Sequence, residues 1–552
     1  MKKKKVSFVL SMIVSLYLLS CGHNTSFKQP DRSAADEISA SSTTAVVQTE
    51  AGKVAGYSDD GVYIFKGIPY AEAERFMPSI KPKTWDGVRS SRAYGPTCPQ
   101  GKRTGWYSDD QAFTFDWDDG FTDENCLRVN IWTPSLANGK KRPVMVWLHG
   151  GGYSAGSGQE LPSYDGAALC KKGDVVVVSL NHRLNVLGFL DLSAFGEKYA
   201  QSGNVGLLDL VAALQWVNNN ISNFGGDPSN VTIFGQSGGG GKVSSLLATP
   251  AAEGLFHKAI VQSGSMLQTM EAKYSRRIGI AIIGELGIPP SQIDDIQKVP
   301  YERLLDAGNK AVAIVRTEAD REGQSAFIFG WAPTVDGTVL PVQPFFPNAP
   351  EQSRNIPMLI GSTLHEFCLS SYVPAFRNIS VEQAKETLQN RYGDKTDDFI
   401  KAFAKAYPGY KPQDLTDVDM MFRPGVVEQA RIKYEQHGAP VYMYMFSWES
   451  PVLDGILRST HCMELPFVFD NIARCRTMTG GTKSAYALAE KMSSAWLNFA
   501  KTGNPNDASL PQWEPYTLEQ GATMFFDNIC QVRYHHDKEL LDIVRTFPAR
   551  GF

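Results

Sequence analysis

A serine-centred segment constrains the fold of this chain more than any other feature. Residues 231–234 (V-T-I-F) are β-branched and aromatic, which predicts a short buried strand, and residues 242–248 open a predicted helix. Between them, residues 235–239 (G-Q-S-G-G) fit the pattern G-x-S-x-G around Ser237. Strand, tight turn and helix are the setting of a nucleophile elbow, where small neighbours let backbone segments pass close to a strained serine. The pentapeptide also arises by chance, and the glycines at 238–241 are compatible with a flexible loop.

A second glycine-rich segment follows an uninterrupted apolar run. Residues 143–148 (P-V-M-V-W-L) predict a parallel strand buried on both faces, and they lead into His149 and residues 150–152, all glycine. Acyl transfer needs backbone N–H donors close to the developing oxyanion, and glycines permit that approach. A turn explains one glycine after a strand, whereas H-G-G-G is typical of an esterase oxyanion loop. We interpret His149 itself as structural.

The neighbouring segments predict an α/β architecture. Residues 175–180 (V-V-V-V-S-L) predict another buried strand, and residues 203–217 predict a helix leading toward the serine segment. Alternation of apolar strands with helical stretches favours a parallel sheet with crossover helices.

Residues 224–239 resemble the serine signature of the type-B carboxylesterase (cholinesterase-like) family, which begins F-G-G and ends G-x-S-x-G. A second signature of that family resembles residues 124–134, and weaker similar segments lie at 332–337 and 496–505. Length alone suggests about three domains. The resemblance instead implies a single α/β-hydrolase domain over residues 45–552, with a large, mostly parallel sheet, flanking helices and long insertions forming a gorge.

The order of the remaining catalytic residues follows from the fold that the resemblance implies. A serine needs a base to take its proton and an acid to orient the base, and α/β-hydrolases carry them in the order Ser, acid, His. His461 lies in a segment similar to the family's catalytic-histidine segment, and Glu366 follows a predicted strand at the family's acid position. Asp336 is the competing acid, but it sits in a Val-Asp-Gly turn. The order or the local sequence argues against His23, His149, His182 and His257, while His437, His535 and His536 are predicted to be solvated.

The resemblance also implies a mechanism. Ser237 attacks the ester, His461 acts as base and then acid, and water hydrolyses the acyl-enzyme, with the N–H groups of Gly151, Gly152 and Gly238 as oxyanion donors. Neither a cofactor nor a metal is expected. The predicted activity is carboxylic ester hydrolysis on a small-molecule substrate. The alternatives are a non-catalytic adhesion-type relative, an amidase, or a lipase acting on long acyl chains.

Three residues of the serine segment depart from the family pattern. Gln236 stands where relatives usually carry Glu, which removes a negative charge beside the nucleophile and argues against a cationic substrate. Gly238 replaces the usual alanine and should keep the oxyanion N–H. Lys242 stands where a small residue is common, so it either hydrogen-bonds at the helix start or favours an acidic substrate.

The N-terminus predicts export. Residues 2–5 are lysines and residues 6–19 an apolar run, which fit a signal peptide over residues 1–20 and are short for a spanning helix. The run ends in L-L-S-C and resembles a bacterial lipobox, so cleavage would leave a lipidated Cys21; ordinary signal cleavage is the alternative. Residues 21–44 predict a disordered tether. We therefore expect export from a bacterial cytoplasm and anchoring in a membrane, on its periplasmic or cell-surface side.

The net charge argues against nucleic acid as a partner, and the cysteine content limits the number of disulfide bonds. The net charge of −4 gives no basic footprint for nucleic acid. Eight cysteines are too few for a disulfide scaffold but permit a few bridges in an oxidising compartment. By resemblance Cys98 pairs with Cys126, the alternative being two buried thiols, and a local bridge between Cys462 and Cys475 is open. The oligomeric state is open as well.

Overall fold

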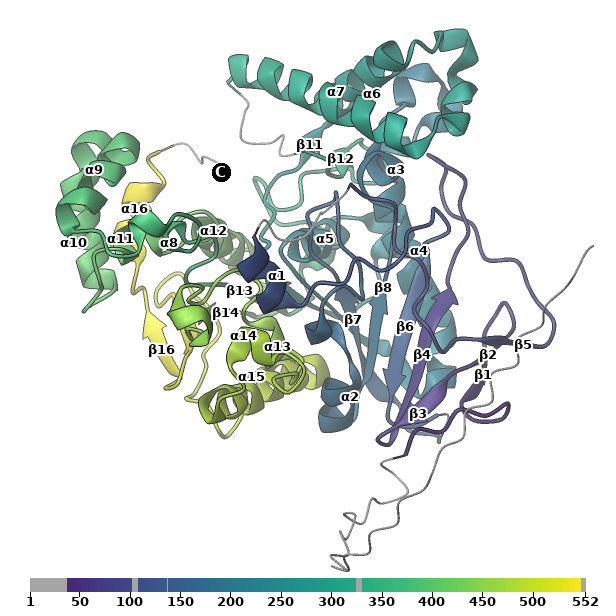
Figure 1. The fold of residues 1–552 in the computed structure, drawn as a ribbon, viewed down its shortest axis with the longest axis horizontal. Helices are drawn as coiled ribbons and strands as arrows, with labels where there is room; N and C mark the ends of the chain where they lie inside the picture. Colours follow the sequence, from purple (N-terminus) through teal and green to yellow (C-terminus); the bar gives the residue numbers. More distant parts are fainter. Residues whose placement is uncertain (1–36, 102–107, 137, 324–329, 548–552) are drawn as a thin grey trace, which may run out of the picture.

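The computed structural model describes residues 37–101, 108–136, 138–323 and 330–547. Within them the chain builds an eleven-stranded sheet in the order β16-β15-β14-β13-β10-β9-β7-β8-β6-β4-β3 (Figure 1). The middle of this sheet is parallel. Its parallel strands are β15 (Ala522–Phe526), β14 (Val441–Phe446), β13 (Met358–Thr363), β10 (Lys258–Gln262), β9 (Gly226–Gln236), β7 (Arg142–Leu148) and β8 (Val176–Leu180).

Antiparallel strands complete both edges of the sheet. They are β16 (Gln531–Tyr534) on one side and β6 (Arg128–Thr133), β4 (Val62–Pro69) and β3 (Tyr57–Asp59) on the other. A small sheet of β1 (Val46–Gln48), β2 (Lys53–Ala55) and β5 (Val88–Ser90) and a short pair, β11 (Met270–Glu271) with β12 (Thr334–Val335), lie outside it.

The apolar core has two layers, one on each face of the sheet. Successive side chains of a strand point to opposite faces. In β7, accordingly, Val144, Val146 and Leu148 join one buried cluster, whereas Met145 and Trp147 join the other. The first cluster includes side chains of α4 (Val205–Asn220), α5 (Gly238–Leu247) and α12 (Arg423–Tyr434). The second includes side chains of α2 (Ala167–Gly173), α13 (Leu465–Val468) and α15 (Lys483–Thr502). Burial on both faces explains why the central strands are continuous apolar runs.

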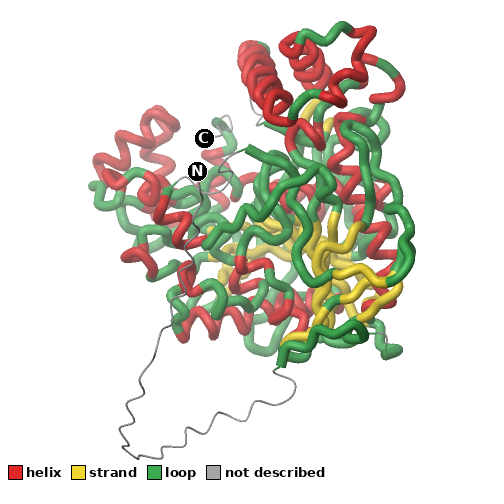
Figure 2. Tube along the Cα trace, turned by 45° about the vertical axis from the view of Figure 1, so that its right-hand side comes forward, coloured by secondary structure: helices red, strands yellow, loops and turns green. Residues whose placement is uncertain are grey.

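Two groups of helices stand outside the sheet (Figure 1, Figure 2). The long helices α6 (Ala272–Leu286) and α7 (Tyr301–Arg321) lie together at the top of Figure 1. At the left, α9 (Val381–Tyr392), α10 (Thr396–Ala406), α11 (Asp414–Asp417) and α16 (Lys538–Val544) share an apolar core of their own. The remaining α-helices are α1 (Asp109–Phe115), α3 (Asn185–Phe189), α8 (Leu369–Tyr372) and α14 (Arg476–Thr479).

The predicted α/β-hydrolase architecture is confirmed, and the strands expected at 143–148, 175–180 and 231–234 are β7, β8 and the end of β9. One alternative is wrong. The glycines at 238–241 form the first turn of α5, not a flexible loop, because the helix begins directly after Ser237. The predicted signal peptide, Cys21 and most of the tether lie outside the described residues. No helix in the described part of the chain is long and apolar enough to cross a membrane.

Candidate active site

Ser237 occupies a strained turn between β9 and α5. Its backbone has φ 58° and ψ −127°, and residues other than glycine rarely adopt a positive φ. The turn is held from both sides, because the Ser237 N–H donates to the Gln262 carbonyl at 2.8 Å and the Ser237 carbonyl accepts from the Gly241 N–H at 3.1 Å. A Cβ on Gly239 would lie 2.0 Å from the Leu148 carbonyl oxygen, so this helix start passes β7 at a distance that only glycine permits.

His461 and Glu366 lie in contact on the loops that follow β14 and β13. The Nδ1 of His461 contacts the Glu366 carboxylate, and the His461 N–H also donates to the Glu366 carbonyl at 2.8 Å. The other carboxylate oxygen accepts from the Thr363 N–H at 2.9 Å. Both side chains are buried. Because a carboxylate only accepts, Nδ1 carries the proton, which leaves Nε2 to accept one.

Gln236 connects this pair to the serine. Its side-chain nitrogen lies 3.2 Å from Nε2 of His461 and 3.3 Å from Nδ1. The Cys462 thiol donates to the side-chain amide oxygen (Oε1) of Gln236 at 3.1 Å. His461 therefore lies against the residue directly before Ser237, and the chain brings all three predicted catalytic residues to the same edge of the sheet.

Two of the three predicted oxyanion donors, Gly152 and Gly238, lie in backbone contact at the residue after Ser237. Gly151 and Gly152 are exposed and have φ values of 79° and 63°, which favour glycine. A Cβ on Gly238 would lie 2.2 Å from the Gly152 carbonyl oxygen, so these two backbones are in contact. A Cβ on Gly150 would lie 3.4 Å from Cβ of Ser237. The loop after β7 thus covers the start of α5 and contacts Ser237.

Two aromatic rings that the sequence analysis did not single out flank the histidine. The Phe367 ring centroid lies 4.6 Å from that of His461, and the Phe422 centroid lies 5.4 Å from it. Phe422 is held in turn by Asp419, whose carboxylate accepts backbone N–H groups of residues 421–423 at 2.8–3.1 Å. Burial, together with the charge of Glu366, raises the pKa of Asp419 to about 7. The contact between Phe422 and His461 could not be predicted from the sequence, because the two residues lie on loops that are distant in the chain.

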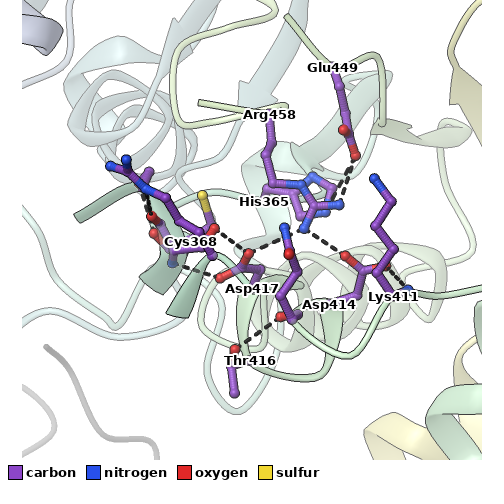
Figure 3. Close-up of polar contacts among 12 residues, drawn as sticks. His365, Cys368, Lys411, Asp414, Thr416, Asp417, Glu449 and Arg458 are labelled. Carbon is purple, nitrogen blue, oxygen red and sulfur yellow. Dashed lines mark hydrogen bonds and ion pairs between the residues drawn. The ribbon is translucent and has the colours of Figure 1, made fainter. Parts of the chain in front are cut away.

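An ion-pair network fastens the loops that carry Glu366 and His461 (Figure 3). The Arg458 guanidinium, 6% exposed, contacts Asp414 at 2.7 Å, Asp417 at 3.2 Å and Glu449 at 2.8 Å. Asp417 also accepts the Ser370 N–H at 2.9 Å. Arg458 lies three residues before His461 and Ser370 lies four after Glu366, so the network ties both loops to α11.

A second tie involves the residues adjacent to this network. The Nδ1 of His365 lies 2.7 Å from the Ser459 hydroxyl. These two residues neighbour Glu366 and Arg458 in the sequence, so the acid and base loops are joined directly as well as through α11.

Three other residues considered in the sequence analysis, Asp336, Lys242 and His536, make contacts that support the fold. The Asp336 carboxylate accepts the N–H groups of Thr338 and Leu340 at 2.8 and 3.1 Å, so the competing acid closes its own turn. Lys242 is fully buried, so the idea that it faces an acidic substrate is wrong: its ammonium donates to the His149 carbonyl at 2.8 Å. The predicted solvation of His536 is also wrong, because its side chain is 6% exposed beneath the Tyr407 and Phe525 rings.

The predicted disulfide between Cys98 and Cys126 is not formed in the structure, and neither is the bridge left open between Cys462 and Cys475. Cys98 and Cys126 are buried free thiols in hydrogen-bond contact, and the Leu184 N–H donates to the Cys98 sulfur at 3.3 Å. Cys462 and Cys475 are free as well, because the Cys462 thiol is directed to Gln236. In the described residues no group of His, Cys, Asp and Glu side chains is arranged to hold a metal ion.

Comparisons with known proteins agree with this geometry. Residues 43–541 match the sequence model of the Carboxylesterase family. The chain is 37% identical to the para-nitrobenzyl esterase of Bacillus subtilis over 517 residues, which cover 92% of this chain and all of the relative. It is 33% identical to the phenmedipham hydrolase of Pseudarthrobacter oxydans, covering 87% and 95% of the two chains. Among solved structures, an esterase of Clostridium hathewayi aligns with a TM-score of 0.82 at 37% identity, covering 93% of this chain and all of that one.

Proposed function

Because this chain belongs to the carboxylesterase family and is a serine hydrolase of carboxylic esters, we propose that Ser237, His461 and Glu366 are its catalytic triad. The observation that carries the proposal is the contact of His461 with Glu366 on one side and with Gln236, the neighbour of Ser237, on the other. It supports the triad over a non-catalytic adhesion role, for which a buried acid–base pair beside a strained serine has no use.

The proposed mechanism proceeds through an acyl-enzyme. The Ser237 Oγ attacks the ester carbonyl carbon while Nε2 of His461 takes the hydroxyl proton. The N–H groups of Gly151, Gly152 and Gly238 bind the oxyanion of the tetrahedral intermediate. That intermediate expels the alcohol, which receives the proton from His461, and leaves the acyl group on Oγ. Water then attacks with His461 again as base, which releases the acid and restores Ser237. Glu366 keeps Nδ1 protonated and stabilises the imidazolium throughout.

A cavity that reaches the Phe367 ring supports small or medium acyl esters as substrates. It has a volume of about 320 Å³ and is lined by apolar residues that include Phe367, Leu369, Leu388, Met420 and Met421 and by polar residues that include Asn390, Arg391, Asp417 and Asp419. Phe367 belongs both to this cavity and to the ring stack on His461. We place the apolar part of the ester here, since rings and thioethers form adaptable apolar walls. The Clostridium hathewayi esterase is described as hydrolysing aliphatic aromatic polyesters, which favours testing aromatic esters too.

Turnover of p-nitrophenyl acetate, butyrate and octanoate, measured beside Ser237→Ala, tests the assignment. The proposal predicts fast turnover that the substitution abolishes, with a chain-length profile set by the cavity. Turnover that survives Ser237→Ala would refute the triad. A folded parent that turns over no ester would return the adhesion-type role to first place.

We further propose export and lipid attachment at Cys21. The lysines at residues 2–5, the apolar run at 6–19 and the L-L-S-C end support it. Export would place Cys98 and Cys126 in an oxidising compartment, where their contact makes them the natural pair to form a disulfide. Mass spectrometry of the mature N-terminus and of non-reduced peptides tests both points. An unmodified N-terminus lacking Cys21 would refute lipidation, and free thiols after export would refute the bridge.

A further inference from the structure

Lys242 is a buried cation at the base of the oxyanion loop. It is 0% exposed and lies in α5, five residues after Ser237. Its ammonium donates to the carbonyl oxygen of His149 at 2.8 Å and to that of Gly150 at 3.5 Å. Placing an ammonium in the interior is costly unless its donors are satisfied. Here the acceptors are the backbone of the loop that meets the nucleophile.

The Gly150 carbonyl matters because of the peptide unit to which it belongs. In a planar trans peptide, the C=O of Gly150 and the N–H of Gly151 point in opposite directions. The Gly150 oxygen also accepts from Nδ1 of His149 at 2.9 Å. Fixing this oxygen therefore fixes the direction of the Gly151 N–H, which is one of the proposed oxyanion donors.

The other donors on this edge are fixed without Lys242. The Gly151 carbonyl, which shares a peptide with the Gly152 N–H, accepts from the Ala155 N–H at 3.1 Å. The Ser237 carbonyl, which shares a peptide with the Gly238 N–H, accepts from the Gly241 N–H at 3.1 Å. Backbone bonds thus orient Gly152 and Gly238, whereas Gly151 depends on the side chains of Lys242 and His149.

We propose that Lys242 is a positioning residue for the oxyanion hole: its ammonium orients and polarises the Gly150–Gly151 peptide so that the Gly151 N–H binds the oxyanion. A cation at the carbonyl end of a peptide strengthens its N–H as a donor, since linked hydrogen bonds polarise one another. The inference rests on the proposed function and adds a residue that does not touch the substrate.

The groups around Lys242 make it the source of positive charge here. His149 and His182 lie close together, with ring centroids 5.3 Å apart, and burial together with the charge of Lys242 lowers the pKa of both rings well below the usual range. Glu160 is the acidic residue whose charge acts on Lys242; its carboxyl accepts the Ser157 N–H at 2.5 Å and the Tyr164 hydroxyl at 3.3 Å, and burial raises its pKa to about 8. Burial lowers the pKa of Lys242 to about 7, and Glu160 opposes that shift.

The test is Lys242→Met, which keeps an unbranched apolar side chain, one heavy atom shorter, and removes the ammonium. We expect kcat for p-nitrophenyl butyrate to fall about 10- to 100-fold, which is somewhat less than removal of an oxyanion donor, with KM within about twofold. The affinity for a trifluoromethyl ketone that adds to Ser237 should fall by a similar factor, because that adduct carries the oxyanion. A purely structural lysine would not produce this split.

Lys433→Met is the matched control. Lys433 is also buried and lies at the C-terminal end of α12. Its ammonium donates to the backbone carbonyls of Ser353 and Arg354 at 2.6 and 3.0 Å. The Lys433→Met variant should lose thermal stability, as Lys242→Met does, but it should keep the parental kcat. Equal loss of kcat in both variants, or a folded Lys242→Met with kcat and ketone affinity within twofold of the parent, would overturn the proposal.

Lys242→Gln decides the matter if Lys242→Met does not fold. Its amide retains a donor for the carbonyls without the charge, so kcat and ketone affinity should fall together by a smaller factor, and parental values for both would overturn the proposal. Ser237→Ala distinguishes failure of the proposed function from failure of the proposed role of Lys242. Activity that survives Ser237→Ala refutes the proposed function, whereas a dead Ser237→Ala beside a fully active Lys242 variant refutes this inference alone.

Discussion

His461 and Glu366 are joined twice, by the contact of Nδ1 with the carboxylate and by the 2.8 Å hydrogen bond from the His461 N–H to the Glu366 carbonyl. The backbone bond sets the distance between the two loops, and the side-chain contact then sets the tautomer of the base. Since the Thr363 N–H holds the second carboxylate oxygen, the acid has little freedom to rotate. The geometry of the proposed acid–base pair is therefore determined by the connections after β13 and β14.

Glu366→Gln should leave the fold intact and reduce kcat by about 10²- to 10⁴-fold. The amide can donate to Nδ1, which selects the wrong histidine tautomer and removes the charge that stabilises the imidazolium. Steady-state kinetics measure the effect. Asp336→Asn is the control for the competing acid and should retain kcat, because Asp336 closes a turn. If Asp336→Asn lost kcat and Glu366→Gln retained it, Asp336 and not Glu366 would be the catalytic acid.

Arg458→Met should destabilise the protein by about 3–5 kcal/mol and lower kcat. It leaves Asp417, whose side chain is fully buried, without its cation, and uncompensated buried charge is expensive. The loops bearing Glu366 and His461 then lose their shared anchor. Denaturant unfolding and kcat are the measurements. Arg474→Gln is the control, because Arg474 is about half exposed and lies 3.7 Å from Asp165, and its effect should stay within about 0.5 kcal/mol. Equal effects of the two variants would contradict the role of the network.

Gly239→Ala should destabilise the protein by about 3 kcal/mol and abolish turnover. Its Cβ would meet the Leu148 carbonyl oxygen at 2.0 Å, and neither backbone can move without displacing the elbow. Gly284→Ala in α6 is the control, because nothing lies within 4 Å of its Cβ and alanine favours a helix by about 0.5–1 kcal/mol. Thermal unfolding and activity distinguish them, and a stable, active Gly239→Ala would show that the elbow is less tightly packed than described.

His536 should make the protein less stable in acid. Burial lowers the pKa of its imidazole to about 3, against an ordinary value of 6.5. Between these values the unfolded chain binds a proton that the native state does not. The free energy of unfolding therefore falls as the pH drops from about 6.5 toward 3, by at most about 1.4 kcal/mol per pH unit.

His536→Phe keeps a ring between Tyr407 and Phe525 and removes the titration. We expect a flatter dependence of unfolding free energy on pH between 4 and 6.5, measured with urea. The exposed His437 supplies the control, and His437→Asn should keep the parental slope. An unchanged slope in His536→Phe would show that His536 is not the titrating group.

The sequence predicted the parts of the site that depend on local pattern and chain order. β7 and β9 are recognisable because both faces are apolar, and Glu366 and His461 follow from the order of the triad and from the family resemblance. The flanking rings of Phe367 and Phe422 and the Arg458 network were not predictable, because they join loops distant in the chain. Lys242 and His536 look like surface residues in sequence, and only packing shows that they are buried.

The central claim is that Ser237 carries the acyl group. Rapid mixing with p-nitrophenyl butyrate, an acid quench and peptide mass spectrometry test it directly. The account predicts a burst of p-nitrophenol equal to the enzyme concentration and one butyryl group on the peptide that contains Ser237, with neither in Ser237→Ala. A butyryl group on another residue, or turnover by Ser237→Ala, would contradict the account.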